Sequence, residues 1–224
     1  MNETFNLKFA QGHPIITIDE KTFVVDTGSP ASFSYSGSIA LCSRQHHVPY
    51  GNYILDSLNR VLRTRIDGLI GGDLMKRLGA VEIDYPNSTI TFHETLPDVT
   101  GASEYDMSVF CNYLIFNTTI DNQPRRVVLD TGAPIPYLCS HILPHRAPDS
   151  FVEDVTPSGT FSSPVYSMET EMGGKKFKVN YGKLPAFHQV MVKIMQCDGV
   201  VGKDIFDLGT VIISYRQGKM YLKF

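Results

Sequence analysis

The tripeptide Asp-Thr-Gly occurs twice in this chain, and each occurrence ends a similar stretch of sequence. Ahead of Asp26, the alternating segment Ile15–Ile18 leads into an Asp-centred turn and a second apolar strand. Ahead of Asp130, the segment Thr118–Ile120 does the same. Alternating strands joined at such turns predict a β-hairpin in each place. A recurrence of this kind indicates an internal repeat, so the chain should fold as two related units.

A second block recurs downstream of each tripeptide, in the same order. Asp67–Leu74 matches Asp198–Ile205, and a short helix should follow each. A pair of strands then closes each copy: Ala80–Tyr85 with Thr89–Phe92, and Thr210–Tyr215 with Lys219–Phe224. The repeat predicts one lobe over residues 1–97, a linker over 98–104 and a second lobe over 105–224.

The fold class predicted from this pattern is all-β. Helix signals are weak, and they occur near Asp73–Leu78, Lys203–Asp207 and Ser140–Leu143. With 13 Pro and 18 Gly, the chain is rich in residues that end helices. We therefore expect two lobes of about six strands each, arranged as an internal pseudo-dimer.

Composition excludes several classes of function. The 224 residues include 20 basic and 23 acidic side chains, so no basic surface for nucleic acid is indicated. No stretch of about 18 apolar residues suggests a membrane span. The first residues lack the apolar stretch of a secretory signal, which predicts a cytoplasmic protein unless a leader has been removed. The four cysteines match no zinc or redox spacing, and we expect buried or free thiols.

The two Asp-Thr-Gly loops suggest a specific chemistry if they meet on a pseudo-two-fold axis. Asp26 would then face Asp130, and Thr27 would face Thr131. Two adjacent carboxyls cannot both ionise easily, so the pair would share a proton. The charged member could act as general base on a water while the protonated member polarises a carbonyl oxygen. This chemistry needs no nucleophilic side chain, metal or cofactor.

These motifs resemble those of the retropepsin and pepsin superfamily of aspartic peptidases. Asp26–Ser29 and Asp130–Ala133 match the family's active-site loops, and the stretch Asp67–Phe92 is similar to bacterial retropepsin-like proteins. The resemblance implies hydrolysis of a polypeptide held in a cleft between two lobes, and cross-bonding of Thr27 with Thr131. It also implies a monomer, because one chain supplies both carboxylates. The residues expected to support the loops are Gly28, Ser29, Gly132 and Ala133, and those expected to pack beneath them are Ile70, Gly71, Val201 and Gly202.

The family's flap, a hairpin that covers the substrate, is expected in the interval between the two blocks. Asp130 is followed by Gly202 after 72 residues, whereas Asp26 is followed by Gly71 after only 45. We therefore predict one working flap, in the second copy, with a hairpin centred on Gly173–Gly174 beside it. The candidate tip is Thr156–Pro164, which includes Ser158, Gly159 and Thr160. The first copy offers only a short stretch near Val48–Tyr53, where Tyr50 and Tyr53 either contact substrate or simply pack.

The residue after each Gly differs between the copies. Ser29 could donate a hydrogen bond to the Asp26 carboxylate, whereas Ala133 could not. This difference predicts that Asp130 is the protonated member of the pair.

Other interpretations of the same residues stay open. A protease fold without activity, kept as a binding module, would also preserve the repeat. Paired carboxylates serve glycosidases as well, and the two tripeptides could be structural turns. His46–His47 and His141 with His145 could suggest a metal site, although Pro144 interrupts the second pair.

Overall fold

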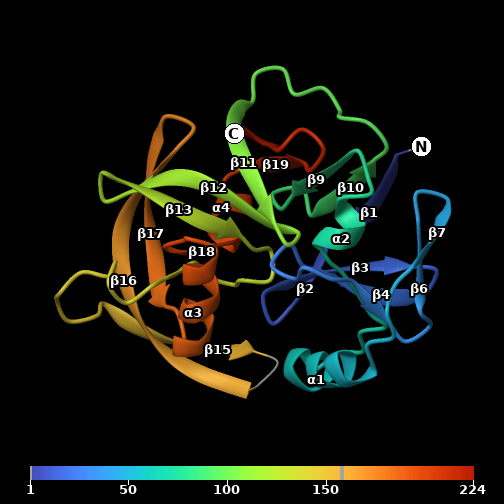
Figure 1. The fold of residues 1–224 in the computed structure, drawn as a ribbon, viewed down its shortest axis with the longest axis horizontal. Helices are drawn as coiled ribbons and strands as arrows, with labels where there is room; N and C mark the ends of the chain where they lie inside the picture. Colours follow the sequence, from blue (N-terminus) through green and yellow to red (C-terminus); the bar gives the residue numbers. More distant parts are fainter. Residues whose placement is uncertain (1, 157–158) are drawn as a thin grey trace.

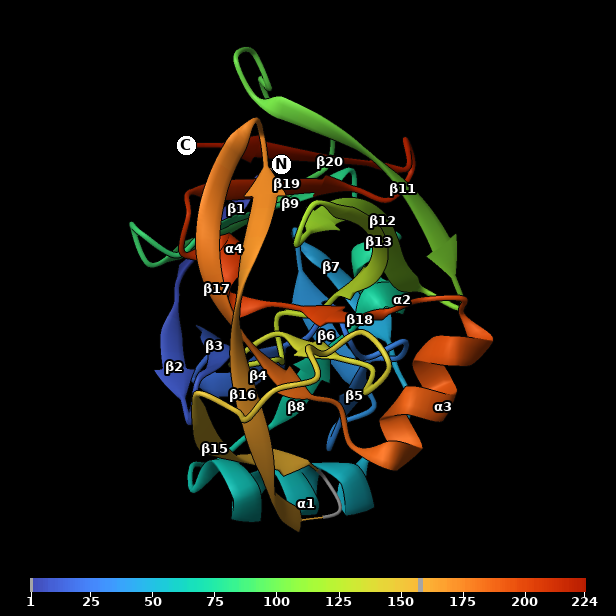
Figure 2. The ribbon, with the colours of Figure 1, turned by 90° about the vertical axis from the view of Figure 1, so that its left-hand side faces the viewer.

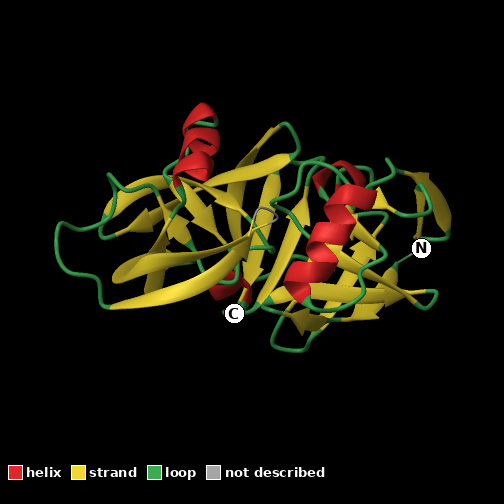
Figure 3. Ribbon diagram, turned by 90° about the horizontal axis from the view of Figure 1, so that it is seen from below, coloured by secondary structure: helices red, strands yellow, loops and turns green. Residues whose placement is uncertain are grey.

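The computed structural model describes residues 2–156 and 159–224, and β-strands dominate it (Figure 3). Up to His93 the strands are β1 (Glu3–Asn6), β2 (Lys8–Ala10), β3 (His13–Ile18), β4 (Lys21–Val25), β5 (Phe33–Ser34), β6 (Ser38–Leu41), β7 (Arg44–His47), β8 (Gly68–Ile70), β9 (Ala80–Asp84) and β10 (Thr89–His93). After it they are β11 (Ser103–Phe110), β12 (Tyr113–Ile120), β13 (Gln123–Leu129), β14 (Tyr137–Leu138), β15 (Ser150–Thr156), β16 (Gly159–Met172), β17 (Lys175–Lys183), β18 (Gly199–Val201), β19 (Thr210–Ser214) and β20 (Lys219–Lys223). The helices are α1 (Asn52–Leu62), α2 (Gly72–Met75), α3 (Ala186–Ile194) and α4 (Lys203–Phe206). The prediction of an all-β chain is confirmed.

The two predicted closing strand pairs are present as β9 with β10 and β19 with β20. They also pair with each other, because β9 runs antiparallel to β19 from Asp84↔Thr210 to Val81↔Ile213. This pairing joins distant parts of the chain in a run of strands ordered β1-β10-β9-β19-β20-β11. The run lies along one side of the molecule, opposite α1 (Figures 1 and 2). The closing strands of the two copies therefore share one sheet, while a separate five-stranded sheet of the first copy has the order β2-β3-β4-β8-β5.

The same local topology precedes each repeated Gly. Strand β4 pairs in parallel with β8, and β13 pairs in parallel with β18 over an equal number of residues. The Asp that opens each repeated block fixes this pairing. Asp67 accepts a hydrogen bond from the Thr22 backbone N–H at 2.9 Å, and Asp198 accepts one from the Arg126 N–H at 3.1 Å. A buried strand end needs such a partner for its backbone donor, which explains why the block recurs with its Asp.

Two of the three expected helices are present, as α2 and α4. Ser140–Leu143 forms turns instead of a helix. The two longest helices, α1 and α3, were not expected from the sequence. In α1, Leu55, Leu58 and Leu62 are buried, a spacing that places them on one helical face. That pattern is visible in the sequence, but Gly51 gives the helix no side-chain cap to mark its start.

The apolar residues of helix α3 are not confined to one buried face. Only Val192 is buried within it, while Phe187, Val190 and Ile194 are exposed. Tertiary contacts decide such a segment more than its periodicity does. None of the helices in the described residues is long and apolar enough to cross a membrane.

The expected linker is an ordered part of the fold. Between the end of β10 at His93 and Ala102 the chain forms neither helix nor strand, and β11 begins at Ser103. Leu96, Val99 and Ala102 pack against the buried side chains of Ala80, Ile212 and Tyr221. The segment thus contacts strands from both copies.

One hydrophobic core runs through both copies. Val81 and Phe92 from the first copy belong to the same buried cluster as Ile213 and Leu222 from the second. Separating the copies would expose this apolar surface and leave the edges of β9 and β19 unpaired.

We therefore expect that a fragment of residues 1–97 does not fold alone, and that 105–224 does not either. Circular dichroism during urea unfolding should show a cooperative transition for the whole chain and none for either fragment. A cooperative transition in an isolated fragment would contradict the shared core.

Candidate active site

Both Asp side chains stand at the ends of strands that are fixed by parallel partners. Asp26 follows β4, and its N–H donates to the Ile70 carbonyl at 2.9 Å. Asp130 follows β13, and its N–H donates to the Val201 carbonyl at 2.9 Å. Ile70 and Val201 are buried beneath the loops. The apolar residue of each repeated block therefore sets the position of the carboxyl above it.

Thr27 and Thr131 tie the two loops together through reciprocal hydrogen bonds. The Thr27 hydroxyl donates to the Leu129 carbonyl at 2.9 Å and accepts from the Thr131 N–H at 2.9 Å. The Thr131 hydroxyl donates to the Val25 carbonyl at 2.8 Å and accepts from the Thr27 N–H at 3.0 Å. Both threonines are fully buried, so these bonds replace water for every polar group involved.

Gly28 and Gly132 let the loops approach each other closely. Each donates its N–H to the carboxylate of its own loop, Gly28 to Asp26 and Gly132 to Asp130, both at 2.8 Å. A side chain at Gly132 would place its Cβ 2.9 Å from the Asp26 carboxyl, and one at Gly28 would overlap the Asp130 carboxyl. Only glycine leaves room for the opposite carboxyl at these two positions.

The two carboxyls share a buried environment that disfavours two charges. Burial raises the pKa of Asp130 well above its usual range, and the nearby Asp26 charge raises it further. Burial also raises the pKa of Asp26, but a hydrogen bond from Asp130, the charge of His13 and backbone N–H groups oppose that rise. These opposing effects make Asp130 the member that holds the proton.

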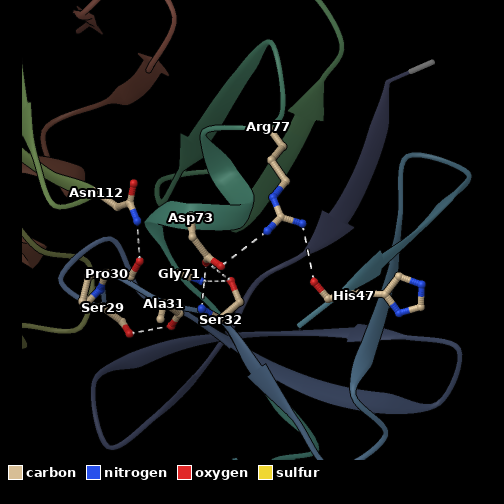
Figure 4. Close-up of polar contacts among 9 residues, drawn as sticks. All are labelled: Ser29, Pro30, Ala31, Ser32, His47, Gly71, Asp73, Arg77 and Asn112. Carbon is tan, nitrogen blue, oxygen red and sulfur yellow. Dashed lines mark hydrogen bonds and ion pairs between the residues drawn. The ribbon is translucent and has the colours of Figure 1, made fainter. Parts of the chain in front are cut away.

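The predicted hydrogen bond from Ser29 to Asp26 is wrong. The Ser29 hydroxyl donates to the Ala31 carbonyl at 2.8 Å, within its own loop (Figure 4). Of the polar groups of Ser29, the backbone N–H is the one that lowers the pKa of Asp26. The N–H of Ala133 holds the equivalent position in the second loop and donates to the Asp130 carbonyl. The Ser29 hydroxyl therefore does not make the two carboxyls differ. The pKa of Asp26 is lowered by the hydrogen bond from Asp130 and the charge of His13, whereas the pKa of Asp130 is raised by the charges of Asp26 and Asp154.

His13 was not singled out from the sequence. It follows the turn between β2 and β3, is almost fully buried, and lines the same cavity as both carboxyls. Its Nδ1 lies 3.1 Å from the Gln11 carbonyl, to which it donates in the tautomer protonated there. The residue in the corresponding place of the second copy, after the turn between β11 and β12, is Tyr113, which also lines the cavity. Histidine in one copy and tyrosine in the other make the site electrostatically asymmetric.

The turns before these two residues each contact the opposite loop. Asn112 donates its side-chain N–H to the Pro30 carbonyl at 2.9 Å (Figure 4). Gly12 lies so close to Pro134 that an added Cβ would be 2.8 Å from the proline Cβ. Each copy thus supports the active-site loop of the other.

The hydrogen-bonded pair of Ser32 and Asp73 supports only the Asp26 loop. Ser32 donates to the Asp73 carboxylate through its N–H at 2.7 Å and its hydroxyl at 2.6 Å, and its hydroxyl accepts from the Gly71 N–H at 2.9 Å (Figure 4). An added Cβ on Gly71 would lie 2.6 Å from the Ala31 carbonyl oxygen. Gly202 packs equally tightly, 2.5 Å from the Ala133 carbonyl oxygen on the same measure. Both glycines are therefore required by packing beneath the loops.

The carboxyls open into a cavity of about 540 Å³. Its walls are mainly apolar and come from both copies, including Ile54 and Leu58 of α1 and Met191 of α3. The polar groups beside these walls are few, which is typical of a binding cavity whose specificity rests on a small number of polar contacts.

A hairpin of the second copy covers this cavity. Strands β15 and β16 pair up to Thr156↔Gly159, and Asp154 and Phe161 of this hairpin line the cavity. The Tyr137 hydroxyl donates to the Asp154 carboxylate and so ties the hairpin to the second copy. The end of β15 and the start of β16 lie near α1 in both views (Figures 1 and 2). Among the predicted tip residues, Gly159 begins β16, Thr160 is exposed, and Ser158 lies outside the described residues.

The neighbouring hairpin centred on Gly173 and Gly174 is confirmed between β16 and β17. Both glycines have positive φ angles, of 57° and 71°, which two-residue hairpin turns require.

The first copy has no covering hairpin of this kind in the described residues. Its interval forms the hairpin β6–β7 and helix α1, and the β6–β7 turn packs away from the cavity, where the Cys42 N–H donates to Glu3 at 2.6 Å. Tyr50 and Tyr53 lie at the start of α1 and are 73% and 84% exposed, outside the residues that line the cavity. Helix α1 occupies the interval in which the sequence offered only a short stretch in place of a flap.

The remaining candidates do not gather into a site. No group of three or more metal-ligating side chains occurs within the described ranges. The His46 Nε2 instead lies 3.1 Å from the Leu41 carbonyl. All four cysteines are free thiols; Cys42, Cys139 and Cys197 are buried, and Cys111 is exposed.

No known family model matches this chain. No curated protein matches it either. Its function is therefore inferred from the geometry of the site.

Replacing Thr27 by Val should destabilise the protein because it keeps the shape but removes the hydroxyl. The Leu129 carbonyl and Thr131 N–H would lose their partner, at about 1–3 kcal/mol for each buried group. Urea unfolding measures the loss. As a control, Thr4→Val removes an exposed hydroxyl pair with Thr91 and should change stability by about 0.5 kcal/mol or less. Equal effects of the two substitutions would contradict the role assigned to Thr27.

Replacing His13 by Gln should raise the pKa of Asp26, because the variant lacks the cation that favours the ionised carboxylate. Carbon-13 NMR of the Asp carboxyl groups measures it directly. Ser29→Ala serves as the control and should leave both carboxyl titrations unchanged, because that hydroxyl bonds to Ala31. A larger effect of Ser29→Ala than of His13→Gln would contradict the assignment.

Proposed function

We propose that this protein is an aspartic endopeptidase with two retropepsin-like β lobes in one chain, in which Asp26 and Asp130 activate a water for peptide hydrolysis. The repeated strand topology supports the two-lobe interpretation. In each copy a hairpin runs into Asp-Thr-Gly, and a parallel strand ends beside it at the repeated Gly.

One observation carries the proposal: two Asp-Thr-Gly loops are cross-bonded through Thr27 and Thr131 so that their carboxyls meet in one buried place. A pair of structural turns needs no such convergence. Burying two acids side by side is unfavourable for folding, since neither is paired with a cation held at hydrogen-bond distance in the described residues. Costly arrangements of this kind concentrate at functional sites.

The different pKa shifts of Asp26 and Asp130 support a different catalytic role for each. Asp26 is the more readily ionised member and accepts a proton from the attacking water as general base. Asp130 holds the other proton and donates it to the carbonyl oxygen of the scissile bond. The water oxygen bonds to the carbonyl carbon to give a neutral tetrahedral diol. The carbon–nitrogen bond then breaks as the amine takes the proton from Asp26, and a diol hydroxyl returns one to Asp130.

The cavity indicates how a polypeptide would lie. Its apolar walls suit side chains on both sides of the scissile bond, and the β15–β16 hairpin offers backbone groups for pairing with an extended chain. Both carboxylates come from one chain, so the proposed catalytic unit is a monomer.

Cleavage of a mixed peptide library should test the proposal. We expect the wild-type protein to cleave peptides in acid-to-neutral buffer, and Asp26→Asn or Asp130→Asn to abolish cleavage, with rates reduced at least about a thousandfold. Asp106→Asn is a matched control, because this exposed carboxyl only pairs with Lys219.

The outcomes separate the main alternatives. Cleavage that persists in either dyad variant would contradict the shared mechanism. A folded wild-type protein that cleaves no peptide at any pH would favour a binding module without activity.

A further inference from the structure

A second cavity, of about 250 Å³, lies away from the two carboxyls. Three arginines line it, from three separate elements: Arg44 on β7, Arg77 just after α2, and Arg216 in the turn between β19 and β20. The first two belong to one copy and the third to the other. We propose that this arginine pocket binds a phosphate group.

The arginines in the pocket have weak partners. Arg44 reaches Glu94 at 3.3 Å through a single nitrogen, and Arg77 reaches Asp73 only at 4.0 Å. Arg216 donates to the Arg77 backbone carbonyl at 3.4 Å. Strong guanidinium pairs are bidentate and nearer to about 2.8 Å. The pocket therefore keeps guanidinium donors that its own acids do not satisfy.

Charge also favours an anion. Three arginines and one acid, Glu94, line the cavity. Two further acids lie beyond the wall: Asp73 next to Arg77, and Glu3, which accepts from the Cys42 N–H at 2.6 Å. The wall itself thus carries more positive than negative side chains, although the whole chain carries a net charge of −3. A local positive field on an acidic protein attracts anions from solution.

The number of donors distinguishes phosphate from a carboxylate. One arginine satisfies both oxygens of a carboxylate, whereas three arginines from three separate elements match a tetrahedral group with more oxygens and more charge. The ligand is therefore either free phosphate or a phosphate carried by another molecule, and the two share the same chemistry.

Binding in the pocket need not disturb the Asp26 loop. Asp73 is held by two short hydrogen bonds from Ser32, so Arg77 can turn toward a ligand while Asp73 stays in place (Figure 4). Within the described residues, the Arg77 guanidinium otherwise makes a 3.5 Å contact with the His47 carbonyl. A ligand held by Arg44, Arg77 and Arg216 together would link the two copies and so stabilise the folded chain.

Isothermal titration calorimetry with inorganic phosphate tests the proposal, at constant ionic strength set with chloride. The full chain should give saturable heat for one site. Arg44→Gln and Arg216→Gln should each weaken binding about tenfold or more, the effect of losing one charge-assisted hydrogen bond. Arg60→Gln on α1 is the matched control, because this exposed arginine lies outside the pocket, and it should bind as the wild type does.

The melting temperature of each variant in chloride, followed by circular dichroism, shows that it is folded. Absence of saturable heat with the wild type would overturn the proposal, and so would equal affinity in Arg216→Gln and Arg60→Gln. A short phosphoserine peptide forms a second arm. Tighter binding of the peptide than of phosphate identifies a phosphorylated partner, and equal or weaker binding identifies free phosphate. Neither arm depends on peptidase activity.

Discussion

The hydrogen bonds between Thr27 and Thr131 are the constraint on which the rest of the site depends. They bring two loops more than a hundred residues apart into contact and satisfy the buried hydroxyl and backbone N–H of both threonines. Gly28 and Gly132 are required because the loops meet so closely. The strands β8 and β18 are required because they hold the backbone of each Asp from behind. The joined sheet through β9 and β19 then fixes the two copies in one orientation.

The two copies differ in the residues that surround their carboxyls. His13 stands on one side of the cavity and Tyr113 on the other. Ser32 and Asp73 brace only the first loop. The second copy covers the cavity with a hairpin, while the first supplies Ile54 and Leu58 of helix α1 to its wall. An identical pair of copies would leave the proton shared equally, whereas the charge of His13 favours its place on Asp130.

Local features of the sequence predicted much of this site, and non-local ones did not. The two Asp-Thr-Gly loops, the repeated Gly and the closing strand pairs each lie within short segments with recognisable patterns. The pairing of β9 with β19 depends on residues more than a hundred positions apart, and no local pattern encodes it. The hydroxyl of Ser29 bonds to the Ala31 carbonyl within its own loop, which sequence spacing does not reveal. His13 reaches the cavity only because a hairpin turn of one copy lies against the loop of the other.

The two long helices were missed for different physical reasons. The leucines of α1 form an ordinary buried face, but the interval was interpreted as a shortened flap. Helix α3 carries apolar residues around much of its surface. Some of them line the cavity, and others are exposed. Its conformation follows from where it packs and not from its periodicity.

The central claim is that Asp26 and Asp130 act as one unit on a ligand placed between them. Binding of a peptide that carries a statine hydroxyl in place of the scissile bond, measured by calorimetry, tests this most directly. The account predicts one ligand per chain, with affinity lost in Asp26→Asn and in Asp130→Asn to a similar extent, because the hydroxyl contacts both carboxyls. Affinity that is unchanged by either substitution, in variants that remain folded, would contradict it.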